Sequence, residues 1–272
     1  MNYLDYLRTD KFPHFWCSGC GNGIVLCAIA RAFEELDLTL ENTVVVTGIG
    51  CWGKADDYVR TNSFHGTHGR ALAFATGIKL ANPSLNVVVL MGDGDGITIG
   101  GNHFIHAARR NVDVTAILAN NFNYGMTGGQ YSGTTPEDRI TTTSRYGHIE
   151  EGFDICAVAK AAGARYVARA STENPQQLKN LIRDGIKKQG FACIEAISPC
   201  PTHFGRNNGM RSPAALMRWV NENSVTPAQA AAMSEEDLAG KLVMGLICDQ
   251  PGEDYSTKYQ HVIEKAQSEV KK

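Results

Sequence analysis

The strongest constraint on the fold is an alternation of two sequence patterns between residues 24 and 197. Short runs of β-branched and apolar residues predict strands at 43–47, 87–91, 113–119, 165–169 and 191–197. Helical patterns lie before and between them at 24–36, 70–80, 102–110, 153–162 and 176–188. Strands separated by helices of this length form right-handed βαβ units. We therefore predict an α/β protein with a mainly parallel sheet and helices on both faces.

The unusual loops of the chain all follow predicted strands. They occupy residues 48–54, 92–96, 120–130 and 198–201, and each is rich in glycine, proline, asparagine or cysteine. In open parallel sheets, ligands bind at the carboxyl ends of the strands. We therefore expect the functional residues to converge on that one edge.

Composition excludes several other classes of protein. The 272 residues are 43% hydrophobic, which is enough for a full-sized core, and the formal net charge is −2. The sequence contains no basic stripe and no apolar run near the ~20 residues that span a bilayer, so neither a nucleic-acid partner nor a membrane is expected. Residues 1–16 lack the apolar core of a secretory signal, and we expect a cytoplasmic protein.

Two polar loops predict a site for a magnesium ion and a phosphate group. Gly-Asp-Gly at Asp93 follows one predicted strand, and an Asn pair that ends at Asn121 follows the next. Glycines allow close approach of backbone N–H groups to phosphate, and carboxylate and amide oxygens suit Mg²⁺. The pattern resembles the thiamine diphosphate motif. Simple Asp-Gly turns are an alternative, whereas a calcium loop is excluded because Phe104 stands where an EF-hand needs Glu.

The eight cysteines divide into two groups by local context. Four lie in apolar runs and are expected to be core residues: Cys27, Cys156, Cys193 and Cys248. Four lie in turns that contain Gly or Pro and are candidate ligands: Cys17, Cys20, Cys51 and Cys200. Because the cytosol is reducing, metal or redox chemistry is favoured over disulfides.

The cysteine spacing alone leaves three kinds of site open. WCSGC is similar to a thioredoxin active site, but no strand is predicted before it. Zinc and an iron–sulfur cluster fit the bare spacing about equally well. A low-potential electron carrier would have a role beside thiamine diphosphate, and this context favours an iron–sulfur cluster.

Taken together, the motifs resemble those of the beta subunits of 2-oxoacid:ferredoxin oxidoreductases, most closely the 2-oxoglutarate type. The matching segments occur in the order PHFWCSGCG, TGIGC, HGTHGRALAFATGIKLANP, MGDGDGITIGGNHFIHAARRN, NYGMTGGQ, and SPCPT with FGRNN. Ser18 replaces a proline that many relatives have between two cysteines. The resemblance implies a thiamine diphosphate-binding fold. It also implies that residues 1–210 bind the cofactor and a [4Fe–4S] cluster, and that residues 211–272 form a C-terminal extension packed on them.

The resemblance assigns roles to individual residues. Cluster ligands would be Cys17, Cys20, Cys51 and Cys200. Magnesium ligands would be Asp93, the Asn121 side chain and the Asn123 backbone carbonyl. Thiamine contacts would be Ile49, Gly50, Cys51, His65, His68, Gly94, Asp95, Gly125, Met126 and Thr127. For the two histidines a structural role is an alternative. Lys54 is a candidate contact for a substrate carboxylate, with a solvated lysine equally favoured.

The activity implied is the oxidative decarboxylation of a 2-oxoacid, with coenzyme A as acyl acceptor and ferredoxin as electron acceptor. 2-Oxoglutarate, giving succinyl-CoA, is the favoured substrate, and pyruvate or a branched-chain 2-oxoacid is the alternative. The glutamate that activates thiamine would lie on an alpha subunit, so a heterodimer or larger hetero-oligomer is expected. A non-catalytic iron–sulfur electron-transfer subunit would not need the intact GDGDG and Asn pair.

Overall fold

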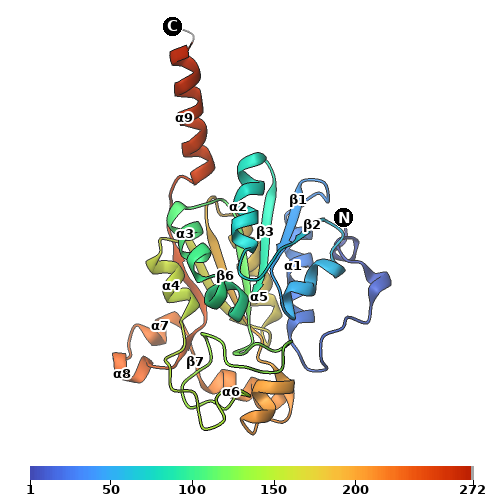
Figure 1. Cartoon of the computed structure of the whole chain (residues 1–272), viewed down its shortest axis with the longest axis vertical. Helices are drawn as coiled ribbons and strands as arrows, with labels where there is room; N and C mark the ends of the chain where they lie inside the picture. The colour runs from blue at the N-terminus through green and yellow to red at the C-terminus, as the bar shows by residue number, and fades with distance from the viewer. Residues whose placement is uncertain (271–272) are drawn as a thin grey trace.

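The main sheet of the computed structural model, which describes residues 1–270, has seven strands in the order β2-β1-β3-β4-β6-β5-β9. All neighbouring pairs are parallel except β5 and β9, which are antiparallel. The strands are β1 (Thr43–Thr47), β2 (Asn62–His65), β3 (Asn86–Gly92), β4 (Thr115–Asn120), β5 (Tyr166–Ser171), β6 (Ala192–Ile197) and β9 (Gly245–Asp249). The predicted α/β fold with a mainly parallel sheet is confirmed (Figure 1).

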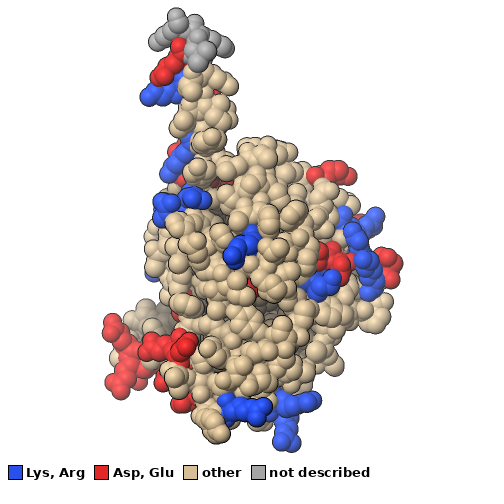
Figure 2. Space-filling view, in the orientation of Figure 1, with Lys and Arg blue, Asp and Glu red and all other residues tan. Residues whose placement is uncertain are grey.

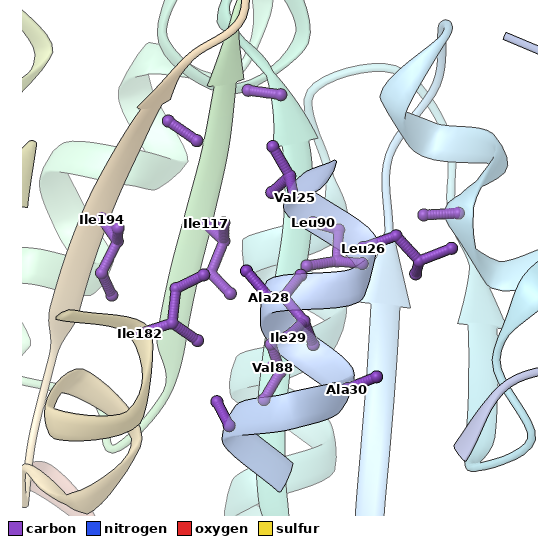
Figure 3. Packing of buried hydrophobic residues seen from close by; sticks show 14 of the residues in the cluster. Val25, Leu26, Ala28, Ile29, Ala30, Val88, Leu90, Ile117, Ile182 and Ile194 are labelled. Carbon is purple, nitrogen blue, oxygen red and sulfur yellow. The ribbon is translucent and has the colours of Figure 1, made fainter. Parts of the chain in front are cut away.

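Helices cover both faces of this sheet, as the sequence predicted (Figure 1). The helices are α1 (Asn22–Glu35), α2 (Ala71–Ala81), α3 (Gly101–Arg110), α4 (Ile155–Ala161) and α5 (Pro175–Lys187). Successive residues of a strand point to opposite faces. In β1, Val45 therefore joins the core under α1 and α5, while Val44 and Val46 join the core under α2, α3 and α4. Figure 3 shows the first of these cores, where Ile29 of α1 faces Val88 and Leu90 of β3.

Five irregular helical turns lie within residues 1–270, and three of them, η3, η4 and η5, follow strands. Three are 3-10 helices: η1 (Tyr3–Tyr6), η2 (Thr9–Lys11) and η3 (Trp52–Tyr58). Two have π-type hydrogen bonding: η4 (Gly94–Ile99), which follows β3, and η5 (Pro201–Gly205), which follows β6. π-helical turns are rare and are often found at functional sites. Both fall within or directly after loops that the sequence singled out.

The C-terminal part contains more structure than the sequence indicated. Residues 206–270 form α6 (Pro213–Glu222), β7 (Ser224–Val225), α7 (Pro227–Ala230), α8 (Glu235–Leu238), β8 (Leu242–Val243), β9 and α9 (Tyr255–Val270). β9 completes the main sheet, and α6 packs on a small third core with Phe122 and Phe204. The division into two parts at residue 210 stays a prediction.

Helix α9 projects from the body of the molecule in Figure 1. The polar residues of 258–272 are typical of a solvated helix, and residues 271 and 272 lie outside the described part of the chain. Figure 2 shows a patch of acidic side chains at the lower left, over α8, whose first turn carries Glu235, Glu236 and Asp237. No helix within residues 1–270 is long and apolar enough to cross a bilayer.

Candidate active site

The loops after β3 and β4 bring Asp93 and Asn121 together. The two strands are parallel neighbours, with Gly92 opposite Ala119, so the residues that follow them lie side by side. The Asn121 backbone N–H donates to Asp93 Oδ1 across 3.3 Å. The predicted convergence of the two loops is therefore present, with Asp93 at the start of η4.

Asp93 is a buried carboxylate that has no cationic partner. Its Oδ2 accepts hydrogen bonds from Ser132 Oγ (2.5 Å) and Thr134 Oγ1 (2.7 Å). Within residues 1–270 no lysine, arginine or histidine forms an ion pair with it. Burial raises the pKa of Asp93 even though these donors act to lower it. A buried charge of this kind needs a counter-charge, which a divalent cation would supply.

Asn123 and Asp95 present buried polar atoms that no protein group satisfies. Asn123 is 2% exposed, and neither Oδ1 nor Nδ2 of its side chain has a hydrogen-bond partner. Asp95 Oδ1 accepts from the Gly69 N–H at 2.8 Å, but its Oδ2 is also unpartnered. Burial raises the pKa of the Asp95 carboxyl as well. Buried groups without partners are rare in folded proteins and indicate a ligand that completes them.

Two glycines allow the close contacts around this polar group. A Cβ on Gly48 would lie 1.7 Å from Asp95 Oδ2, so the loop after β1 fits against the GDGDG turn only because it carries no side chain there. A Cβ on Gly94 would lie 2.3 Å from the Tyr124 ring, whose hydroxyl donates to the Gly94 carbonyl at 3.1 Å. Tyr124 therefore covers the turn, a role the sequence did not suggest.

The four loop cysteines lie around the same edge. The Cys200 N–H donates to the Asn121 carbonyl at 3.4 Å, and the Cys20 N–H donates to the Cys17 carbonyl at 2.9 Å. Cys51 Sγ lies 3.6 Å from the Cβ position of Gly125, which also borders the Asn121 side chain. All four thiols are free.

The thiols influence one another electrostatically. Burial is the main reason that the pKa of Cys20 rises to about 11, and the neighbouring Cys200 and Cys17 thiols raise it further. Burial likewise raises the pKa of Cys51 to about 12, with contributions from all three other loop thiols. Four mutually interacting sulfurs match the donor set of a zinc ion or an iron–sulfur cluster, either of which would stabilise the thiolates.

The other cysteines mostly lie where the sequence predicted. Cys156, Cys193 and Cys248 are buried in the core that contains α2, α3 and α4. The prediction for Cys27 was wrong, because this residue of α1 is only partly buried. It lines an open pocket beside Cys20 at the edge of the helix face, where apolar neighbours in sequence do not guarantee burial.

Aromatic residues enclose the cysteine loops on one side. The Trp16 ring lies 5.8 Å from the Trp52 ring and 5.2 Å from the Tyr58 ring, between centroids. Trp16 Nε1 donates to the Cys51 carbonyl at 2.6 Å. No role for these side chains was predicted from the sequence, although Trp16 and Trp52 each stand next to a loop cysteine.

Lys54 and His65 have protein partners at the margin of the site. Lys54 forms a half-exposed ion pair with Asp57 at 2.6 Å, and the Asp57 contact is the main reason that its pKa is raised. His65 Nδ1 lies 3.0 Å from Thr47 Oγ1 and 3.1 Å from Asp56 Oδ2.

The remaining predicted thiamine contacts are partly open. His68 is exposed, and its carbonyl accepts from Arg70 at 3.1 Å. Ile49 and Gly50 lie in the loop that reaches Asp95, with Gly50 at φ 107°. Met126 is half exposed, and Thr127 Oγ1 donates to Gln130 Oε1 at 2.7 Å. Their contacts with a cofactor stay predictions.

Comparison with known proteins agrees with this geometry. Residues 48–196 match the family of the thiamine pyrophosphate enzyme, C-terminal TPP binding domain. The 2-oxoglutarate synthase subunit KorB of Methanothermobacter marburgensis is 49% identical over 268 residues, which cover 98% of this chain and 94% of that one. The KorB subunit of Methanocaldococcus jannaschii is 50% identical over 266 residues, and each chain is covered to 98%.

A solved structure has the same fold. The 2-oxoglutarate:ferredoxin oxidoreductase from Magnetococcus marinus, determined with 2-oxoglutarate, coenzyme A and succinyl-CoA bound, superposes with a TM-score of 0.87. The two are 31% identical, and the match covers 98% of this chain and 91% of that chain. Fold and site thus define a thiamine pyrophosphate-binding domain of an oxidoreductase. More closely, the chain belongs to the family of 2-oxoglutarate synthase and 2-oxoacid:ferredoxin oxidoreductase beta subunits.

Proposed function

We propose that this chain is the beta subunit of a 2-oxoglutarate:ferredoxin oxidoreductase. The reaction joins 2-oxoglutarate and coenzyme A to give succinyl-CoA and CO₂, and two oxidised ferredoxins each accept one electron. The observation that carries the proposal is the 49% and 50% identity, over nearly the whole chain, to subunits named for 2-oxoglutarate synthase. The 2-oxoglutarate and coenzyme A bound to the Magnetococcus marinus enzyme support the same substrates.

The polar edge would hold magnesium and thiamine diphosphate. Asp93, the Asn121 side chain and the Asn123 backbone carbonyl would surround the cation. The buried side-chain amide of Asn123, which has no partner, supports a ligand beside them. The backbone of Gly94 and Asp95 would line the diphosphate. When bound, thiamine diphosphate supplies the nucleophilic carbon and the electron sink that decarboxylation of a 2-oxoacid requires.

The four loop cysteines would hold a [4Fe–4S] cluster, which supplies one-electron transfer to ferredoxin. Cys51 would belong to both parts of the site, because its sulfur lies beside Gly125 in the loop after β4 while its pKa responds to the other three thiols. The ring of Trp16, whose indole donates to the Cys51 carbonyl, would limit access of water and oxidants to the cluster.

Lys54 is proposed as a contact for a substrate carboxylate. Its present partner, Asp57, lies at a half-exposed position, and such surface pairs contribute at most ~1 kcal/mol. Exchanging Asp57 for a substrate carboxylate therefore costs little. An alpha subunit would supply the glutamate that activates thiamine, and the complex is proposed to be cytoplasmic, with ferredoxin as its partner.

The test uses the complex of this chain with its alpha subunit, purified without oxygen. Iron, sulfide and thiamine content are measured first, and we expect four irons and one thiamine diphosphate per chain. Dye reduction is then followed with coenzyme A and 2-oxoglutarate, pyruvate or a branched-chain 2-oxoacid. A higher kcat/KM for pyruvate would reject the substrate, and zinc without sulfide would reject the cluster.

A further inference from the structure

A buried ion pair contacts Asn120, the residue that precedes Asn121. Arg169 of β5 and Glu195 of β6 are opposite each other on adjacent parallel strands and are 2% and 1% exposed. Arg169 Nε donates to Glu195 Oε2 at 2.7 Å, and Arg169 Nη2 reaches Asp154 Oδ1 at 2.5 Å. Replacing a buried ion pair with apolar side chains is often neutral or stabilising, so stability alone does not explain why this pair lies in a core sheet.

The group is not a vacant metal site. The ligand atoms of Asp154, Cys156 and Glu195 lie within 4.8 Å of one another, which is close enough for a metal ion. The guanidinium of Arg169, however, already contacts both carboxylates and supplies the positive charge. Although burial acts to lower the pKa of Arg169, the Glu195 carboxylate raises it, so the guanidinium stays charged.

The second oxygen of Glu195 connects this pair to the active site. Asn120 Nδ2 donates to Glu195 Oε1 at 2.8 Å, and Asn120 is the buried last residue of β4. A side-chain amide has one donor end and one acceptor end, whereas an ionised carboxylate can only accept. Glu195 therefore determines the orientation of the amide, and the Asn120 oxygen points away from it, toward the active-site loop.

That oxygen holds the turn that carries the candidate magnesium ligands. Asn120 Oδ1 accepts from the Phe122 N–H at 3.0 Å, and Phe122 has a φ of 63°. A bulky side chain in the left-handed region is strained and persists only where its surroundings impose it. The residues on either side of Phe122 are Asn121 and Asn123, so the orientation of the Asn120 amide sets the positions of both.

A second contact leads from Asn120 to Asp93. The Thr134 hydroxyl lies 3.1 Å from Asn120 Oδ1 and 2.7 Å from Asp93 Oδ2. Its single proton goes to the carboxylate at the shorter distance, and the Asn120 oxygen limits where the hydroxyl can lie. The Asn120 oxygen thus contacts both the turn that carries Asn121 and Asn123 and the hydroxyl that donates to Asp93.

We propose that Glu195 is a positioning residue for the magnesium and diphosphate site and acts through Asn120. Arg169 holds the carboxylate in place through the 2.7 Å contact, Glu195 orients the Asn120 amide, and Asn120 holds the turn. The inference rests on the proposed thiamine diphosphate site. It predicts that a side chain which touches neither metal nor cofactor controls their affinity.

The test is a double-mutant cycle between Glu195→Gln and Asn120→Ala in the complex with the alpha subunit. Glutamine has the same size, but it can present its oxygen to Asn120 or to Arg169, not to both. We expect Glu195→Gln to weaken Mg²⁺-dependent binding of thiamine diphosphate ~10–100-fold by calorimetry. In the Asn120→Ala background it should cause no further loss. The matched control is Glu35→Gln, which removes an ion-paired glutamate on α1 and should leave the affinity unchanged.

Each other outcome is decisive. Full affinity in Glu195→Gln, or an equal loss in both backgrounds, would overturn the inference, because Glu195 would then not act through Asn120. If Glu195→Gln does not fold, the double variant Arg169→Met with Glu195→Met replaces the pair with apolar side chains of similar length. That variant should fold, keep its iron content and lose affinity, and full affinity would overturn the inference. A wild-type complex that binds no thiamine diphosphate would overturn the proposed function, and the inference with it.

Discussion

Two groups of buried acidic side chains, linked through Asn120 and Thr134, differ in whether the protein supplies a positive partner. Glu195 has the Arg169 guanidinium and the Asn120 amide, so both of its oxygens are paired. Asp93 is equally buried, but its partners are neutral donors, and the nearby Asn123 amide has no partner at all. The charge of Glu195 is therefore balanced within the fold, whereas the group around Asp93 lacks a positive charge.

This difference separates structural from functional burial of charge. Burial of either carboxylate costs desolvation energy. Only for Glu195 does the protein itself supply the compensating positive charge. In the proposed function, binding of a cation would offset the cost at Asp93 and Asp95, so these residues would contribute to affinity for the ligand and not to the stability of the free protein. Substitutions in the two groups should therefore affect different measurements.

The largest expected effect is that of Asp93→Asn on cofactor binding. The substitution keeps an acceptor for Ser132 and Thr134 but removes the negative charge. Loss of a group that only supports a metal ligand lowers metal affinity ~10–100-fold. Asp93 would be a ligand itself, so we expect Mg²⁺-dependent thiamine diphosphate binding to weaken at least about 100-fold by calorimetry. In cofactor-free protein the variant should be as stable as wild type or more so. A large loss of stability there would break the comparison. Asp113→Asn, which affects a pair with Lys79, is the control.

Loss of a loop thiol should remove the metal cluster, but loss of a core thiol should not. Cys200→Ala deletes one of four interacting sulfurs, whereas Cys193→Ala shortens a fully buried side chain in β6. We expect the first variant to lose most of the broad visible absorption and of its iron, and the second to retain both. Equal loss in the two variants would show that the absorption reports stability, not ligation. The comparison requires purification and spectroscopy without oxygen.

Removing Arg169, the cationic partner of Glu195, should destabilise the fold. Arg169→Met leaves Glu195 buried without a positive partner, which typically costs about 3–5 kcal/mol. Arg183→Met removes a cation that pairs with Glu35 and Asp184 near the surface and should cost at most ~1 kcal/mol. Denaturant unfolding of both variants measures the difference. A similar cost for the two would mean that Glu195 does not depend on Arg169.

Periodicity in the sequence was sufficient for the core of the fold but not for its edges. TVVVT of β1 and the helix at 71–81 have clear patterns, and both were predicted to within a residue. β2 was missed because Asn62–His65 is polar and exposed, so hydrogen bonding to β1 alone makes it a strand. The apolar run that contains Cys248 shows no sign in sequence that it pairs antiparallel with β5.

The loops that form the site were predicted from local motifs, but the side chains that reach them from elsewhere in the fold were not. Glycines, cysteines and an Asn pair at strand ends mark an edge of the sheet, and the loops do converge there. Contacts made across the fold left no local pattern. Ser132 and Thr134 lie in a polar loop far along the chain from Asp93, and Glu195 stands inside the apolar run ACIEAI. A lone acidic residue in a buried strand was a signal of a buried partner.

The smallest expected effect concerns Asp254, a carboxylate whose two oxygens both accept hydrogen bonds from neutral donors. Burial acts to raise its pKa, but hydrogen bonds from Thr257, Gln189 and Ser256 lower it below its usual value. A depressed pKa stabilises the fold above the unfolded pKa of about 3.9, and this stability is lost as pH falls through the folded value. Asp254→Asn should therefore lower stability by about 0.5–1.5 kcal/mol near neutral pH. The difference in Tm from wild type should stay constant down to about pH 5 and shrink below about pH 4. A difference that grows on acidification would mean that Asp254, like Asp93, lacks a compensating partner.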